Sequence, residues 1–196
     1  VRPTPTSPNP QDGSNFFENS NLRIWGGKGG VKFPAMPVTI SPEQPDTADA
    51  RALIAELDAY LIPLYPPASH HGYPVEKLIA EGVDFFIVRV DGTAAGCGAV
   101  KFFLPNYAEL KRMYVRPPFR RLGLGRKIIG YLEEFILQKG IRTIRLETGV
   151  LQADAIGLYE RMGYKRIEPF GEYLPDPLSY FYEKQLPHPS LPSPNP

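Results

Sequence analysis

Two glycines stand where a predicted strand meets a predicted helix, and they constrain this chain more than any other feature. Residues 107–115 are rich in β-forming side chains, and apolar side chains recur with helical spacing from Ile128 to Ile136. Gly123 and Gly125 lie between these segments. Glycines at such a turn let a ligand approach the backbone, and the first helical turn offers unpaired N–H groups and a positive dipole end. The sequence therefore predicts an anion site, and phosphate is the natural anion for it.

Two common phosphate-binding motifs are absent. The sequence contains no Gly-x-x-x-x-Gly-Lys-Ser/Thr, which excludes a Walker loop. It also fails the Gly-x-Gly-x-x-Gly pattern, because position 128 is Ile128. The motif present is Arg-x-x-Gly-x-Gly, from Arg120 to Gly125. On its own, Gly-x-Gly also fits an ordinary connection between a strand and a helix.

Three further features occur around this motif in a fixed order. Residues 110–117 form the strand before the loop, a strand at 143–148 follows the next helix, and a second helix begins at Gln152. From Gln152 to Tyr164 the chain fits Asn-x-x-Ala-x-x-x-Tyr-x-x-x-Gly-Phe/Tyr, except that Gln152 replaces the Asn. Together with the loop, this order resembles the GCN5-related N-acetyltransferases, the GNAT family. The resemblance is detailed from about residue 85 to residue 185.

The resemblance implies an α/β fold (α+β mixed sheet) with a central mixed sheet and helices on both faces. The sequence pattern agrees with it. Asp91-Gly92 predicts a two-residue hairpin turn, and Asp46 can cap a first helix whose apolar stripe includes Leu53, Leu57 and Tyr60. We expect strands at 38–40, 84–90, 93–103, 107–115, 143–148 and 179–185, and a short helix at 75–81.

Composition separates one globular domain from two tails. Residues 1–37 and 187–196 are rich in proline and lack periodic apolar positions, so we expect flexible tails on either side of a GNAT domain at 38–186. The net charge of +1 gives no reason to expect a nucleic-acid binder. No apolar run reaches the ~20 residues that span a bilayer. The single Cys97 allows no intrachain disulfide and fits a reducing, cytoplasmic compartment. We expect no nucleic acid, membrane or metal partner.

The resemblance also implies where coenzyme A binds. In the family the fourth and fifth strands splay apart, and the pantetheine arm of acetyl-CoA lies in the gap. The pyrophosphate then meets backbone N–H groups around the two glycines, and basic side chains follow its charge. The basic residues come without the interleaved aromatics of a nucleic-acid platform. The implied cofactor-binding residues are Met113, Tyr114, Val115, Arg120, Arg121, Leu122, Gly123, Leu124, Gly125, Arg126 and Gln152.

Acyl transfer to an amine sets the catalytic requirements. An amine with pKa ~10.4 costs roughly 4 to 5 kcal/mol to deprotonate at neutral pH, and the leaving thiolate needs a proton. Tyr159 matches the family tyrosine whose phenol faces the cofactor sulfur, although it also lies on an apolar stripe and could be core. Glu109 is the candidate base. Strand alternation would place it on one face with Lys111, Met113 and Val115, although a bulge in the strand could reset this pattern.

Alternatives to this base stay open. Glu109 could equally be an exposed carboxylate paired with a neighbouring cation. His70 and His71 are rival bases, because imidazole titrates in the useful pH range, although solvent-facing histidines are more common. The expected acceptor-binding residues are Tyr65, His70, Tyr73, Glu172 and Tyr173, with Asp176 nearby.

We therefore predict an enzyme that moves an acetyl group from acetyl-CoA to a primary amine by direct transfer in a ternary complex. The acceptor would be a small molecule or a peptide. The alternative is a non-catalytic acyl-CoA-binding sensor or regulatory module. Family members commonly pair across strands, so a homodimer is also an expectation.

Overall fold

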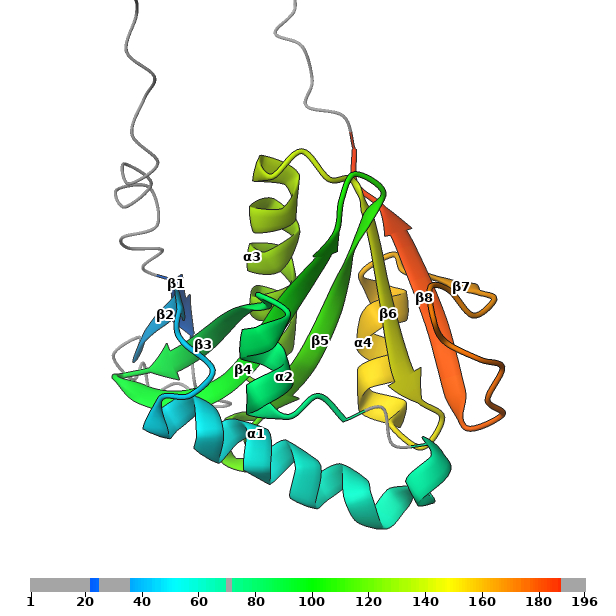
Figure 1. Cartoon of the computed structure of the whole chain (residues 1–196). Coiled ribbons are helices and arrows are strands. Elements are labelled where there is room, and N and C mark those ends of the chain that lie inside the picture. The colour runs from blue at the N-terminus through cyan, green and yellow to red at the C-terminus, as the bar shows by residue number, and fades with distance from the viewer. Residues whose placement is uncertain (1–21, 25–35, 70–71, 188–196) are drawn as a thin grey trace, which may run out of the picture.

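A mixed sheet forms the centre of the computed structural model, which describes residues 22–24, 36–69 and 72–187 (Figure 1). Within these residues the sheet has eight strands in the order β1-β2-β3-β4-β5-β6-β8-β7. The strands are β1 (Leu22–Ile24), β2 (Met36–Pro42), β3 (Asp84–Val90), β4 (Thr93–Phe103), β5 (Tyr107–Val115), β6 (Thr143–Gly149), β7 (Lys165–Ile167) and β8 (Ser179–Gln185). The helices are α1 (Ala48–Leu61), α2 (Val75–Ala80), α3 (Leu124–Gln138) and α4 (Ala153–Arg161).

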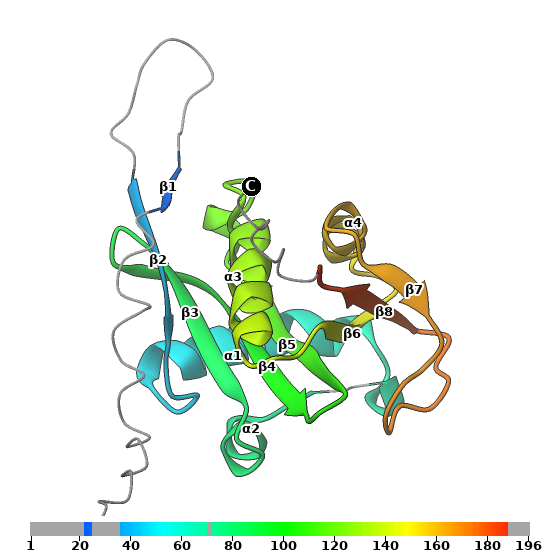
Figure 2. The same ribbon diagram turned by 90° about the horizontal axis from the view of Figure 1, so that it is seen from above.

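Helices cover both faces of this sheet, as predicted. Figure 2 shows α3 and α4 on one side and α1 and α2 on the other. Successive side chains of β3 divide between the two cores, because a strand alternates its faces. Phe86 and Val88 pack with Ile128 and Leu132 of α3. Phe85 and Ile87 instead join the core beneath α1 and α2.

The strands β5 and β6 form a fork. All neighbouring pairs from β1 to β5 are antiparallel, but β5 and β6 run parallel. Their pairing starts at Ala108↔Ile144 and ends at Leu110↔Leu146, although both strands continue. Figure 1 shows the two strands diverging toward the end of α1. The edge of β5 beyond Leu110 is therefore not paired with β6.

A bulge in β5 changes which side chains face the fork. Cys97 of β4 pairs with Tyr114, while Ala99 pairs with Lys111, and Arg112 between them has φ +55°. The extra residue shifts the alternation by one position. Met113 consequently packs with Val115 on the α3 core, against the space that Gly98 leaves open. Of the two expected arrangements, unbroken alternation and a bulge that resets it, the structure has the bulge, so Met113 and Val115 do not share the face of Glu109 and Lys111.

The predicted turn of the first hairpin is confirmed, but two predicted details of α1 are wrong. The cap of α1 is Thr47, whose Oγ1 accepts the N–H of Ala50 at 3.3 Å, and not Asp46. Tyr60 was predicted in the buried stripe, but it is 43% exposed, while Leu53 and Leu57 are buried. Asp91 and Gly92 both have positive φ, which confirms the predicted hairpin turn.

The sheet begins earlier than predicted. β1 lies within the segment expected to be a tail, and it pairs with Met36 to Val38 of β2. The other residues of both predicted tails, 1–21, 25–35 and 188–196, lie outside the described residues, so their flexibility stays a prediction. No helix in the described part of the chain is both long enough and apolar enough to cross a membrane.

A buried ion pair attaches α1 to the bulge, and it generates a prediction about stability. Arg112 donates to Asp58 Oδ1 at 2.5 Å, and the Arg112 side chain is only 5% exposed. We expect Asp58→Ala to lower the free energy of unfolding by about 2 kcal/mol in urea denaturation. That is less than the ~3–5 kcal/mol of a fully buried pair, because water reaches Asp58.

Asp49→Ala is the matched control. Asp49 pairs with Arg89 at 2.7 Å, but half of its side chain is exposed and Arg89 keeps Glu43 as a second partner. Its loss should cost less than ~1 kcal/mol. Equal losses for Asp58→Ala and Asp49→Ala would contradict the buried-pair interpretation.

Candidate active site

The turn before α3 presents a row of free backbone donors. Gly123 is the N-cap of α3, and the first backbone bond of the helix runs from Lys127 N to Gly123 O at 3.1 Å. None of the N–H groups from Arg121 to Arg126 donates to a backbone carbonyl of the described residues. They gather at the positive end of the helix dipole, which favours an anion.

The two glycines of the motif serve separate purposes. Gly123 has φ +75° and open space where a Cβ would stand, so its conformation is what requires glycine. Gly125 faces α4 instead: a Cβ there would lie 2.8 Å from Leu158 Cδ2. Gly125 therefore brings the start of α3 close to α4, which the sequence interpretation did not foresee.

The basic residues near the turn divide into structural and available cations. Arg116 makes a two-pronged contact with Glu56 and also donates to the Ala94 carbonyl. Arg120 donates from Nε to the Val115 carbonyl at 3.1 Å. Arg121 and Arg126 are exposed and form no ion pair with a described residue. These two cations flank the free N–H groups.

The remaining predicted cofactor residues take different positions. The side chains of Tyr114 and Leu124 are buried in the two cores, and Leu122 is half-buried, so only their backbones face the turn or strand edge. Met113 and Gln152 line the pocket described next. Gln152 is the N-cap residue of α4, but its side chain makes no capping hydrogen bond.

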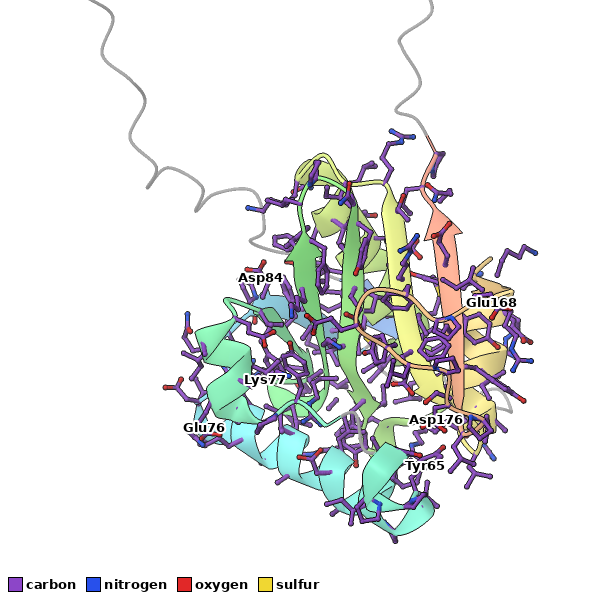
Figure 3. All side chains as sticks on the ribbon, turned by 45° about the vertical axis from the view of Figure 1, so that its right-hand side comes forward. Tyr65, Glu76, Lys77, Asp84, Glu168 and Asp176 are labelled. Atoms are coloured by element: carbon purple, nitrogen blue, oxygen red, sulfur yellow. The ribbon has the colours of Figure 1, made fainter. Side chains whose placement is uncertain are left out.

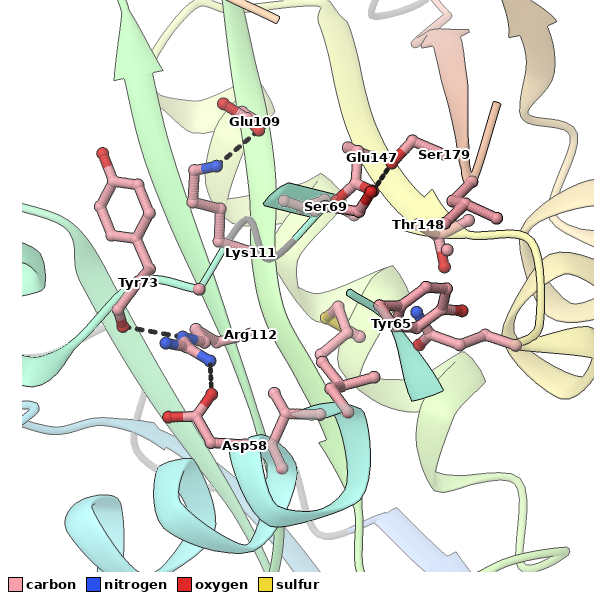
Figure 4. A pocket seen from close by; sticks show the side chains of 18 of the residues that line it. Asp58, Tyr65, Ser69, Tyr73, Glu109, Lys111, Arg112, Glu147, Thr148 and Ser179 are labelled. Carbon is pink, nitrogen blue, oxygen red and sulfur yellow. Dashed lines mark hydrogen bonds and ion pairs between the residues drawn. The ribbon is translucent and has the colours of Figure 1, made fainter. Parts of the chain in front are cut away.

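A pocket of about 340 Å³ lies between the arms of the fork (Figure 4). Its walls come from the end of α1, the connection to α2, both fork strands, α4 with its N-cap residue, and the connection before β8. Its charged lining residues are Asp58, Glu109, Lys111, Arg112 and Glu147. Among the described residues, no group of three or more His, Cys, Asp or Glu side chains could hold a metal ion.

Glu109, Lys111 and Tyr173 form a closed hydrogen-bonded triangle on one wall. Lys111 Nζ lies 2.7 Å from Glu109 Oε1 and 2.9 Å from the Tyr173 hydroxyl, which donates to the same Glu109 oxygen at 2.6 Å. Burial first, and then the charge of Glu109, raise the pKa of Tyr173, so its phenol stays protonated. Glu109 is 2% exposed and ion-paired. The geometry thus combines the predicted base position with the predicted alternative of a paired carboxylate, except that the carboxylate is buried.

A second carboxylate in the pocket, Glu147, was not predicted from the sequence. It lines the pocket from β6 and accepts the Ser179 hydroxyl at 2.6 Å. Alternation along 143–149 could have indicated it, because Glu147 shares a strand face with Arg145, which pairs across from Glu109. What the sequence did not reveal is that the fork brings this face of β6 toward β5.

Tyr159 is both core and pocket wall. It is 5% exposed, its ring contacts Tyr164 edge-on at 5.9 Å, and it lines the pocket. Burial first, and then the charge of Glu147, raise the pKa of its hydroxyl. The Tyr159 phenol therefore stays protonated at neutral pH.

The predicted acceptor residues are only partly brought together. Tyr65, Tyr73 and Tyr173 line the pocket, but the Tyr73 hydroxyl bonds to Glu81 and Lys101. Glu172 is exposed and lies outside the pocket lining.

Asp176, expected near the acceptor site, also lies outside the pocket lining. It belongs to the connection before β8 (Figure 3), and its Oδ1 accepts the N–H of Leu178 at 2.8 Å. His70 and His71 lie outside the described residues. Their roles stay predictions.

Comparison with known proteins decides the family. The sequence model of the family described as Acetyltransferase (GNAT) family matches residues 53–164. An IAA acetyltransferase from Azospirillum brasilense is 41% identical over 150 residues, which cover 76% of this chain and 98% of that protein. The chain belongs to the GNAT family. It is therefore an acyl-CoA-dependent N-acyltransferase, which confirms the predicted family and enzyme class.

Solved structures agree with this assignment. An inferred acyl-CoA N-acyltransferase from Klebsiella pneumoniae shares 38% identity with a TM-score of 0.65, covering 76% of this chain and 97% of that one. A GNAT acetyltransferase from Elizabethkingia anophelis, solved with acetyl-CoA bound, has a TM-score of 0.58 at 14% identity, covering 76% and 98%. Its likeness concerns the fold alone. The predicted GNAT fold is thus confirmed.

The charged triangle makes a prediction for a double-mutant cycle. Lys111→Met would leave the Glu109 carboxylate buried without its cation, and we expect it to cost about 3 kcal/mol in urea denaturation. Glu109→Gln combined with Lys111→Met removes both charges and should recover more than half of that loss. Strictly additive losses would show that the two charges are not coupled.

Proposed function

We propose that this protein is an N-acetyltransferase that moves an acetyl group from acetyl-CoA to a primary amine by direct transfer in a ternary complex. The observation that carries the proposal is the fork, which joins a row of free backbone donors to a pocket containing carboxylates and phenols. Bound acetyl-CoA would supply an activated acyl thioester.

The residues around the α3 turn fit a diphosphate. The free N–H groups between Arg121 and Arg126 can donate to phosphate oxygens, and the two exposed arginines add charge without giving up an existing ion pair. Beyond Leu110, the edge of β5 has no partner in β6 and can bond amide groups of an extended ligand arm. These features support a coenzyme A site that runs from the turn into the fork.

The pocket supplies the acid–base groups. Deprotonating an acceptor amine costs roughly 4 to 5 kcal/mol at neutral pH, so a nearby carboxylate has to take up the proton. We assign this role to Glu109, which Lys111 and Tyr173 hold in one position. Glu147 lies on the facing strand and can share in binding the amine.

We assign to Tyr159 the donation of a proton to the leaving thiolate of coenzyme A. The raised pKa of Tyr159 keeps the hydroxyl protonated, and the residue lines the pocket from α4. Direct transfer also agrees with the state of Cys97, because burial raises the pKa of this thiol to about 12. A protonated, buried thiol is a poor nucleophile for a covalent intermediate.

Removal of the Tyr159 hydroxyl group tests the enzyme proposal. We expect Tyr159→Phe to lower kcat on the order of 100-fold, because the leaving thiolate loses its donor. The Kd for CoA, measured by calorimetry, should stay unchanged. Tyr182→Phe is the control: Tyr182 is also buried, but its hydroxyl bonds to Glu160 and does not line the pocket.

The outcomes separate catalysis from sensing. A kcat of Tyr159→Phe equal to that of the wild type would remove Tyr159 from the mechanism. Tight CoA binding by the wild type without acetylation of any amine in a broad panel would favour a non-catalytic sensor instead.

A further inference from the structure

Tyr65 crosses the open end of the fork. It belongs to the connection between α1 and α2, yet its hydroxyl accepts the N–H of Leu151 at 3.1 Å in the turn between β6 and α4. Gly149 makes this approach possible, because a Cβ at that position would overlap the Tyr65 hydroxyl and ring. The tyrosine therefore fastens the α1 side of the pocket to the end of β6.

Tyr173 crosses the fork from the other side, near the point where β5 and β6 separate. It belongs to the connection between β7 and β8, and its hydroxyl reaches Glu109 and Lys111 of β5. Its ring is fixed by contacts with Phe170 at 5.2 Å and Phe181 at 5.3 Å. Each side of the fork thus carries a connection whose tyrosine is bonded to the opposite side.

The two crossings narrow the pocket, which stays partly open to solvent. Both tyrosines line it, and its volume of about 340 Å³ lies at the lower end of the ~300–1,000 Å³ typical of small-molecule sites. A polypeptide acceptor needs an open groove, because an extended chain continues by about 3.3 Å for each residue after its first. Such a chain would have to pass Tyr173 or Tyr65, which lies near Thr148 at the end of β6 (Figure 4).

We infer that the acceptor is a small-molecule primary amine, and that Tyr65, docked on Gly149, is the residue that excludes polypeptides. This inference rests on the proposed function and narrows it to one substrate class. This contact requires glycine at the end of β6, because any side chain at position 149 would overlap Tyr65.

Matched acceptor pairs test the inference. Each pair consists of an amino-acid amide and a pentapeptide amide with the same first residue, so that the reacting amine is identical and only length differs. With acetyl-CoA and a free-thiol readout, we expect kcat/KM of the wild type to favour the short acceptor on the order of 100-fold. Tyr65→Ala should reduce that ratio on the order of tenfold, whereas Tyr65→Phe keeps the ring and should preserve it.

A second variant guards against misfolding of Tyr65→Ala. Gly149→Ala leaves Tyr65 in the chain but adds a Cβ that displaces its ring, so the preference for short acceptors should also fall. Equal kcat/KM for both members of each pair in the wild type would overturn the inference. An unchanged ratio in folded Tyr65→Ala and Gly149→Ala would overturn it as well.

A different result would refute the proposed function itself. A wild type that binds CoA in calorimetry but acetylates neither the amides nor the pentapeptides refutes the transferase proposal, and the substrate class falls with it. Acetylation of pentapeptides as fast as amides refutes the substrate class alone.

Discussion

The short parallel pairing between β5 and β6 is the constraint on which the rest of the structure depends. The two strands keep register only from Ala108↔Ile144 to Leu110↔Leu146 and then separate. The separation exposes one edge of β5, and it leaves a pocket in the middle of the sheet. The turn before α3 then lies at the end of that exposed edge. The missing pairing between β5 and β6 beyond Leu110 therefore creates the space for an extended ligand.

Buried charge keeps this fork in a defined shape. Arg112 sits in the bulge with φ +55°, where it bonds to Asp58 of α1 and to the Tyr73 carbonyl. Lys111 and Glu109 pair on the adjacent wall. Buried pairs add little net stability compared with apolar packing, because desolvation offsets their attraction. Their value here is geometric: Arg112 links α1 to β5, and the Glu109–Lys111 pair holds the Tyr173 hydroxyl of the connection before β8.

The sequence predicted the elements well and their side-chain surroundings less well. The bounds of β3, β4, β5 and β8 matched, because alternation and turn residues are local signals. The sequence left two faces open for Met113, because one extra residue in β5 has no local signature and becomes visible only opposite Gly98. Glu147 was missed and the docking of Tyr65 on Gly149 went unseen, because both depend on segments distant in sequence.

Amide hydrogen exchange with and without CoA tests the central claim most directly. The account predicts that CoA slows exchange of the N–H groups from Arg121 to Arg126, where no backbone acceptor of the described chain protects them. It also predicts slower exchange along the edge of β5 beyond Leu110. Saturating CoA that leaves these amides unprotected, or protects only a different surface, would contradict a diphosphate site at the start of α3.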